Sequence, residues 1–148
     1  MQYLNKVPSI GKSTPAHQDG YCYKIKPQQA VTMWLSLGEV DEKNGVVCYI
    51  PGSHEDGMRA HNTTETLGFS QGISDWSVID DENEMKAPAG DILVLHSSTI
   101  HRANANFAEN TRPSVGFIFY RQDVIEDTAA HDSSQLTLDK NLAVQGKI

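Results

Sequence analysis

The apolar residues of this chain fall in short runs of strand length, separated by glycine and proline turns. Four runs stand out, at 29–37, 46–50, 91–95 and 115–120, and Pro51 ends the second of them. Runs of this length, bounded by turn residues, are typical of β-strands. Because no helical pattern alternates with them, the sequence predicts an all-β fold, either an antiparallel sandwich or a barrel.

The run 29–37 has the clearest alternation. One set of alternate residues is wholly apolar: Val31, Met33, Leu35 and Leu37. The other set is mixed: Thr32, Trp34 and Ser36. Side chains two apart share a face of a strand, so the apolar set is predicted to face the core.

The remaining segments give weaker patterns. Residues 22–25 and 78–79 resemble short strand pieces, whereas 52–75 is polar and reads as irregular chain with one short helical turn. Residues 124–148 lack a clear period and are predicted to be a loosely held tail with some helix. A length of 148 residues suits a single domain, 1–148.

Charge and composition exclude several classes of protein. The net charge is -7, from twelve Lys and Arg against nineteen Asp and Glu, which disfavours a nucleic-acid partner. Two cysteines without a CxxC motif give no disulfide framework. No run approaches the ~20 apolar residues of a membrane span, and the start of the chain lacks a signal-peptide pattern. A cytoplasmic protein without membrane contact is expected.

The stretch TPAHQDGYCY, residues 14–23, places His17 and Asp19 two positions apart. In an extended chain both side chains point to one face, so an imidazole and a carboxylate can reach a single ion. Two histidines and one carboxylate form the facial triad of non-haem Fe(II) oxygenases. An H-x-D pattern alone is common by chance, and the second histidine must come from elsewhere.

His96 and His101 are the best candidates for that second histidine, because both follow the apolar run 91–95. The other histidines lie in loops or in the tail: His54, His61 and His131. Arg112 opens the last apolar run. Arginines at such positions commonly pair with a surface acid, but one that points into a barrel needs an anion, and a dicarboxylate would supply it.

Three blocks of the sequence together resemble the phytanoyl-CoA dioxygenase family of Fe(II)- and 2-oxoglutarate-dependent oxygenases. The blocks are HQD at 17–19, NGVVCYIPGSHEDG at 44–57 and GDILVLHSSTIHRANANFAENTRPS at 90–114. In that family the 2-oxoglutarate arginine follows the second metal histidine by eleven residues, which is the spacing of His101 and Arg112. The resemblance therefore assigns His101 to the metal and leaves His96 as a packed or hydrogen-bonded neighbour.

The resemblance implies a double-stranded β-helix, a jelly-roll barrel of the cupin type. It implies Fe(II) on His17, Asp19 and His101, and 2-oxoglutarate on Arg112. Trp34 resembles a family position near the cosubstrate, although a core tryptophan explains it equally well, and Gln18 either touches the cosubstrate or faces solvent. At Ala103 family members often carry a hydroxyl that helps to hold the cosubstrate. The region before His17 is shorter than in the family, so either the domain is a minimal or truncated form, or another subunit of a homodimer supplies the missing wall.

The activity that the resemblance implies is hydroxylation of a small molecule with O2 and 2-oxoglutarate. Asp19 favours hydroxylation over halogenation, because halogenating members of the family have a small residue in place of the carboxylate. Two alternatives stay open: a non-catalytic or truncated cupin-like metal-binding barrel, and a structural sandwich with surface histidines. The substrate is not encoded in a recognisable motif. Its contacts are expected in the loop 52–85, which contains several candidate side chains: Met58, Arg59, His61, Phe69 and Trp76.

Overall fold

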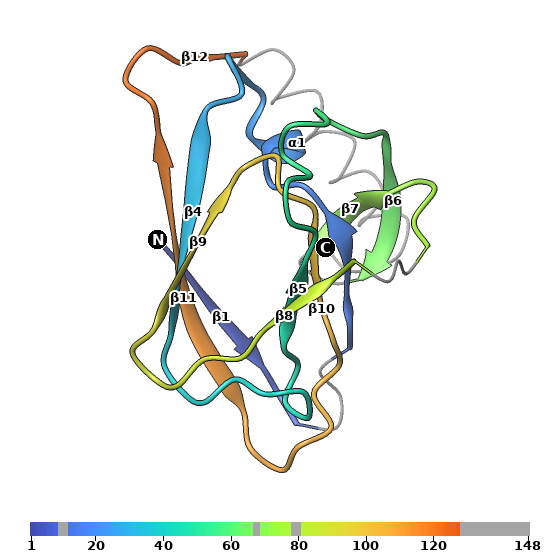
Figure 1. Cartoon of the computed structure of the whole chain (residues 1–148), viewed down its shortest axis with the longest axis vertical. Coiled ribbons are helices and arrows are strands. Elements are labelled where there is room, and N and C mark those ends of the chain that lie inside the picture. The colour runs from blue at the N-terminus through green and yellow to red at the C-terminus, as the bar shows by residue number, and fades with distance from the viewer. Residues whose placement is uncertain (9–11, 67–68, 78–80, 128–148) are drawn as a thin grey trace, which may run out of the picture.

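The computed structural model describes residues 1–8, 12–66, 69–77 and 81–127. Over these residues it is almost entirely β-structure (Figure 1). The predicted strand at 78–79 and most of the predicted tail lie outside the described residues.

Two four-stranded antiparallel sheets form the body of the fold. The first contains β1 (Gln2–Lys6), β11 (Arg112–Tyr120), β4 (Ala30–Ser36) and β9 (Ile92–His96), in that order. The second contains β2 (Thr14–His17), β10 (His101–Ala103), β5 (Val47–Tyr49) and β8 (Asn83–Met85), in that order. Figure 1 shows the sheets as two layers facing one another.

The strand order identifies the barrel. Counting only these eight strands along the chain, the first sheet runs first, eighth, third, sixth, and the second runs second, seventh, fourth, fifth. Successive strands thus pass repeatedly from one sheet to the other, which is the jelly-roll or double-stranded β-helix arrangement. The predicted fold class is confirmed.

Short additional elements lie at the edges of the barrel. They are α1 (Gly20–Tyr23), the pair β3 (Ile25–Lys26) with β12 (Ile125–Glu126), and the hairpin of β6 (His61–Thr66) with β7 (Phe69–Ile73). The hairpin corrects the prediction that 52–75 is irregular. The prediction of a strand piece at 22–25 is wrong over its first half, which belongs to α1.

Gly72 lets the hairpin approach β2 closely. A Cβ at this position would lie 2.9 Å from Thr64 Cγ2 and 3.2 Å from Pro15 Cβ, so a side chain does not fit without a shift. The close approach places Phe69 beside His17, with 5.3 Å between the ring centroids.

The four strongest predicted strands are present as β4, β5, β9 and β11, but the predicted faces of β4 are reversed. Thr32 and Trp34 line the cavity between the sheets. The alternate, apolar set therefore points to the outside of the sheet. Leu37 of this set is 46% exposed, and Val94, which pairs with Met33 across β4 and β9, is 53% exposed. The prediction that this stripe is core is wrong.

In the described part of the chain, buried apolar residues form two small clusters. Ala16, Ile73 and Ile100 form the first cluster, beside the hairpin. Val40, Val46 and Cys48 form the second, and Trp34 packs against it. A cavity lined by residues of both sheets holds the polar residues discussed below.

Candidate metal centre

The pairing of β2 with β10 brings two histidines face to face. His17, the last residue of β2, is the direct antiparallel partner of His101, the first residue of β10. Their ring centroids are 4.2 Å apart. Paired positions on antiparallel strands project to the same face, so both rings point into the barrel.

Asp19 reaches the same point through a turn, not through the strand. The chain leaves β2 after His17, and Asp19 has helical dihedral angles as the N-cap residue of α1. Backbone bonds fix this turn, since the Cys22 N–H donates to the Asp19 carbonyl and the Gly20 N–H donates to the Ser97 carbonyl. The expected convergence of His17 and Asp19 is therefore present, but the extended geometry predicted for it is wrong.

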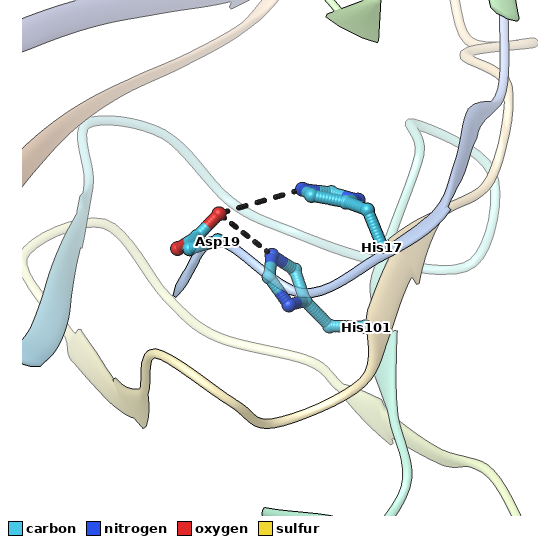
Figure 2. A group of neighbouring side chains, drawn as sticks. All are labelled: His17, Asp19 and His101. Atoms are coloured by element: carbon cyan, nitrogen blue, oxygen red, sulfur yellow. Dashed lines mark ion pairs between the residues drawn. The ribbon is translucent and has the colours of Figure 1, made fainter. Parts of the chain in front are cut away.

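Figure 2 shows the Asp19 carboxylate facing both imidazoles, with dashed lines from one oxygen to each ring. Asp19 Oδ1 lies 3.5 Å from His17 Nε2 and 3.7 Å from His101 Nε2. All three ligand atoms lie within 4.8 Å of one another. Two ligand atoms on one ion, each with a bond of roughly 2.1 Å, lie at most about 4.2 Å apart, so both distances to Oδ1 suit a shared ion.

The other nitrogen of each ring fixes the tautomer. His17 Nδ1 is 2.8 Å from the Pro15 carbonyl oxygen, and His101 Nδ1 is 3.0 Å from the Thr99 carbonyl oxygen. A carbonyl only accepts, so each Nδ1–H donates and Nε2 is the nitrogen left to face Asp19 Oδ1. Two imidazole nitrogens that face one carboxylate oxygen can share a cation with it. The donor set therefore fits a divalent metal ion.

The charges of the three groups agree with this geometry. Burial alone would raise the pKa of Asp19, but His101, His17 and the hydrogen bond from Thr32 together hold that pKa well below its ordinary value. Burial, followed by the charge of His17, lowers the pKa of His101. At neutral pH the site thus presents an ionised carboxylate and a neutral His101 imidazole, which are the forms that bind metal.

Arg112 is a buried cation without an anionic partner among the described residues. It is 5% exposed, and its Nε and Nη1 atoms are buried with no hydrogen-bond partner there. Its Cζ lies 5.0 Å from the centre of the Trp34 ring, a cation–π contact. Burial lowers the pKa of Arg112 to about 10, so it stays charged at neutral pH. A buried, unpaired guanidinium indicates that an anion binds beside it.

One cavity of about 400 Å³ joins these groups. The three candidate metal ligands, Arg112 and Trp34 all line it. Ala103 also lines it, and its side chain offers no hydrogen-bond donor. The cavity thus presents a cluster of metal-ligating atoms and a cation to the same enclosed space.

A family comparison agrees with this arrangement. The model of the phytanoyl-CoA dioxygenase (PhyH) family matches residues 1–114. The chain belongs to the phytanoyl-CoA dioxygenase family. Among curated relatives, the peroxisomal phytanoyl-CoA dioxygenase of Mus musculus is 25% identical over 81% of this chain and 38% of its own length. The phytanoyl-CoA dioxygenase domain-containing protein 1 of Danio rerio is 30% identical over 74% of this chain and 40% of its own length.

The same fold occurs in solved structures. The crystal structure of EvdO2 from Micromonospora carbonacea var. aurantiaca, complexed with 2-oxoglutarate, superposes with a TM-score of 0.71 at 24% identity. The superposition covers 84% of this chain and 51% of EvdO2. This likeness shows the jelly-roll fold of the phytanoyl-CoA dioxygenase family in the present chain. The chain spans less than half the length of the mouse and zebrafish relatives.

Gln18 has a structural position in this member of the phytanoyl-CoA dioxygenase family. Its side chain is fully buried and does not line the cavity. Its Nε2 donates to the carbonyl oxygens of Gly57 and Ser98, and its Oε1 accepts from the Arg59 N–H. The geometry supports neither cosubstrate contact nor solvent exposure for Gln18. Its neighbours His17 and Asp19 line the cavity, whereas the Gln18 side chain points away from it.

His96 is a hydrogen-bonded neighbour, as expected. Its Nδ1 accepts from the Ser98 N–H, and its ring lies 5.4 Å from that of His54. His61 is buried, and its Nε2 accepts from the Gln18 N–H. Of the residues expected to contact substrate, only Phe69 lines the cavity in the described part of the chain, whereas Trp76 packs against the first apolar cluster.

Two cavity residues escaped the sequence analysis. Thr32 donates its hydroxyl hydrogen to Asp19 Oδ2 at 2.6 Å, and Tyr23 Oη lies 2.9 Å from Thr32 Oγ1. The signal for Thr32 was present, since it is two residues from Trp34 on the same face of β4. The assumption that this face points outward concealed it.

Among the described residues, no helix is long and apolar enough to cross a membrane.

Proposed function

We propose that this chain forms the barrel of an Fe(II)- and 2-oxoglutarate-dependent dioxygenase that hydroxylates a small molecule. One observation carries the proposal. The cavity that holds two histidines and an aspartate around one point also holds the unpartnered guanidinium of Arg112. A metal site alone does not require a second, cationic site, whereas a cosubstrate that bridges a metal and an arginine requires both.

The metal would bind through His17 Nε2, Asp19 Oδ1 and His101 Nε2. The Nδ1 hydrogen bonds of both imidazoles and the ionised carboxylate leave these three atoms directed at one point. Two histidines and one carboxylate leave further coordination positions open, as non-haem Fe(II) oxygenases require. Asp19 also favours hydroxylation over halogenation, because its carboxylate fills the position that a halide would need.

Arg112 would bind the distal carboxylate of 2-oxoglutarate. Its Nε and Nη1 hydrogens have no other partner among the described residues, so they are available to a carboxylate. Trp34 lies against the guanidinium and limits its rotation. Ala103 contributes only a methyl group, so in this chain Arg112 acts without a hydroxyl from position 103.

When bound, Fe(II) with 2-oxoglutarate and O2 supplies the oxidising power that converts a C–H bond of the substrate to C–OH, while the cosubstrate becomes succinate and CO2. The protein orients the reactants and excludes water. Leu93, Leu95 and Ile118 give the cavity apolar walls.

The cavity lining favours a small, largely uncharged substrate. Arg102 lines the cavity too, but its Nε and Nη2 donate to Glu82 and its Nη1 donates to Asn104. Its charge is therefore neutralised within the protein. The other side chains near Asp19 include Cys22, Tyr23 and Phe69, which suit an apolar or aromatic molecule.

The homodimer and the cytoplasmic location remain predictions from the sequence. Light scattering at two protein concentrations tests the homodimer, because a reversible dimer loses mass on dilution.

An anaerobic titration tests the proposed function. Fe(II) is added to the protein under argon, followed by 2-oxoglutarate, and the visible spectrum is recorded. A charge-transfer band that appears only with both additions supports the proposal, because 2-oxoglutarate must chelate the metal to produce it. Tight metal binding without the band would instead support a non-catalytic metal-binding barrel, and no metal binding would reject both.

A further inference from the structure

The two oxygens of the Asp19 carboxylate have different surroundings. Oδ1 faces both histidine Nε2 atoms, at 3.5 and 3.7 Å. Oδ2 points to β4 of the opposite sheet and accepts the hydroxyl hydrogen of Thr32 at 2.6 Å. One oxygen is thus directed at the candidate metal position, and the other is held by a side chain.

The hydrogen bonds beyond Asp19 run in one direction. An ionised carboxylate only accepts, so the single hydroxyl hydrogen of Thr32 belongs to the bond with Asp19. Tyr23 Oη, 2.9 Å from Thr32 Oγ1, must then be the donor in the next bond. The bond from Tyr23 makes the Thr32 hydroxyl a better donor to Asp19, and Tyr23 also lies within hydrogen-bonding reach of Asp19 itself.

The three residues come from two separate parts of the barrel. Asp19 and Tyr23 lie one turn apart around α1, whereas Thr32 lies on β4 and faces the cavity. The bond between Thr32 and Asp19 therefore connects the turn that carries the carboxylate to the sheet that carries Arg112 and Trp34. This hydrogen bond fixes the rotation of the Asp19 carboxylate about its Cβ–Cγ bond.

We propose that Thr32, supported by Tyr23, is a positioning residue that makes Asp19 a ligand through one oxygen only. This inference rests on the proposed metal site. A carboxylate that bound through both oxygens would take one more position around the metal and leave fewer for 2-oxoglutarate and O2. By holding Oδ2, the Thr32 hydroxyl keeps that position free.

The test compares four full-length variants in metal binding. Thr32→Val removes the hydroxyl and keeps the shape, Thr32→Ser restores the hydroxyl, and Tyr23→Phe removes only the outer donor. Thr63→Val, at an exposed position of β6 outside the cavity, is the matched control. Co(II) is titrated under argon, which gives both an affinity and a visible spectrum that depends on coordination number. Circular dichroism of the metal-free proteins checks folding.

Thr32→Val is expected to weaken Co(II) binding about 10- to 100-fold, as is usual for the partners of metal ligands, and to change the cobalt spectrum. Thr32→Ser should restore both properties, Tyr23→Phe should show a smaller loss, and Thr63→Val should match the parent. A Thr32→Val protein with parental affinity and spectrum overturns the inference while leaving the metal site intact. If Thr32→Val does not fold, the other two variants decide. Unchanged cobalt binding in Tyr23→Phe then overturns the supporting role of Tyr23. A cobalt spectrum of Thr32→Ser that differs from the parental spectrum overturns the role of the Thr32 hydroxyl. A parent that binds no Co(II) instead refutes the proposed function.

Discussion

His17 and His101 are direct partners across the antiparallel pair of β2 and β10. Their positions are therefore set by backbone hydrogen bonding, and Asp19 is the one member of the group that depends on a turn. The carboxylate supplies the negative charge of the group, which determines how strongly a divalent ion binds.

Replacing Asp19 with Ala is expected to abolish hydroxylation and to weaken metal binding by about 100-fold or more, because two neutral imidazoles remain. Metal affinity is measured by Co(II) titration, and turnover by succinate formation. Asp19→Asn keeps the shape and serves as the comparison, since it loses the charge alone. Parental metal affinity in Asp19→Asn would show that the carboxylate is not a ligand.

Arg112→Met is expected to lower the affinity for 2-oxoglutarate by roughly 30- to 4000-fold, the range for removing one partner of a buried charge pair. Metal affinity should remain near the parental value, because Arg112 does not contact the three ligands. The amplitude of the charge-transfer band during 2-oxoglutarate titration measures the effect. Arg112→Lys keeps the charge but loses the planar fork, so an intermediate affinity is expected.

The same Arg112→Met variant should be more stable than the parent when no ligand is present. The guanidinium is buried without an anion among the described residues, so its desolvation is uncompensated. A gain of about 1–2 kcal/mol in the free energy of unfolding is expected from urea denaturation. Saturating metal and 2-oxoglutarate should stabilise the parent more than the variant. A large loss of stability in the ligand-free variant would contradict this account.

Lys6 should make stability depend on pH. Its Nζ donates to the carbonyl oxygens of Lys12 and Asn104, and burial, followed by the charge of Arg112, lowers its pKa from the ordinary 10.5 to about 8. Between these values the unfolded chain binds more protons than the folded protein, so stability rises with pH, by at most about 1.4 kcal/mol per unit. Below pH 8 both states are protonated and Lys6 adds no slope.

Urea denaturation of the parent and of Lys6→Met between pH 7.5 and 9.5 measures this rise. The difference between the two profiles isolates Lys6, because both proteins keep the cysteines and tyrosines that also titrate at alkaline pH. Parallel profiles would show that the amine keeps its ordinary pKa.

Gln18→Leu is expected to lower the free energy of unfolding by about 2–5 kcal/mol, since it removes three hydrogen bonds and leaves the buried Ser98 carbonyl without a partner. Once folded and loaded with metal, the variant should bind 2-oxoglutarate within about threefold of the parent, because Gln18 does not line the cavity. Gln29→Leu, at an exposed position, is the matched control. A stable Gln18→Leu protein with much weaker 2-oxoglutarate binding would return Gln18 to the cosubstrate site.

The run 29–37 shows how far sequence patterns reach in this fold. Its alternation predicts strand β4 and separates the two faces correctly. It does not tell which face points inward, and the usual preference for apolar cores gave the wrong answer. The interior of this barrel is a cavity that contains the candidate metal ligands and Arg112, and Thr32 and Trp34 line it while the apolar stripe is outside.

The candidate site could be predicted from the spacing of its residues, not from strand alternation. The spacing of His101 and Arg112 reflects the short connection from β10 to β11, which resemblance to a family can reveal. The turn at Asp19 and the hydrogen bonds of Gln18 depend on distant backbone groups, such as Ser97 and Ser98, and no local pattern encodes them. The hairpin of β6 and β7 was missed because its residues are polar, although the threonines of 61–66 favour strands.

The order of the strands along the chain also governs when the site can form during synthesis. The segment with His17 and Asp19 leaves the ribosome early, yet its partner strand β10 and the arginine of β11 are made much later. Until then the nascent chain carries two of three ligands and no closed barrel. We therefore expect the proposed metal ion to bind only after both sheets have closed.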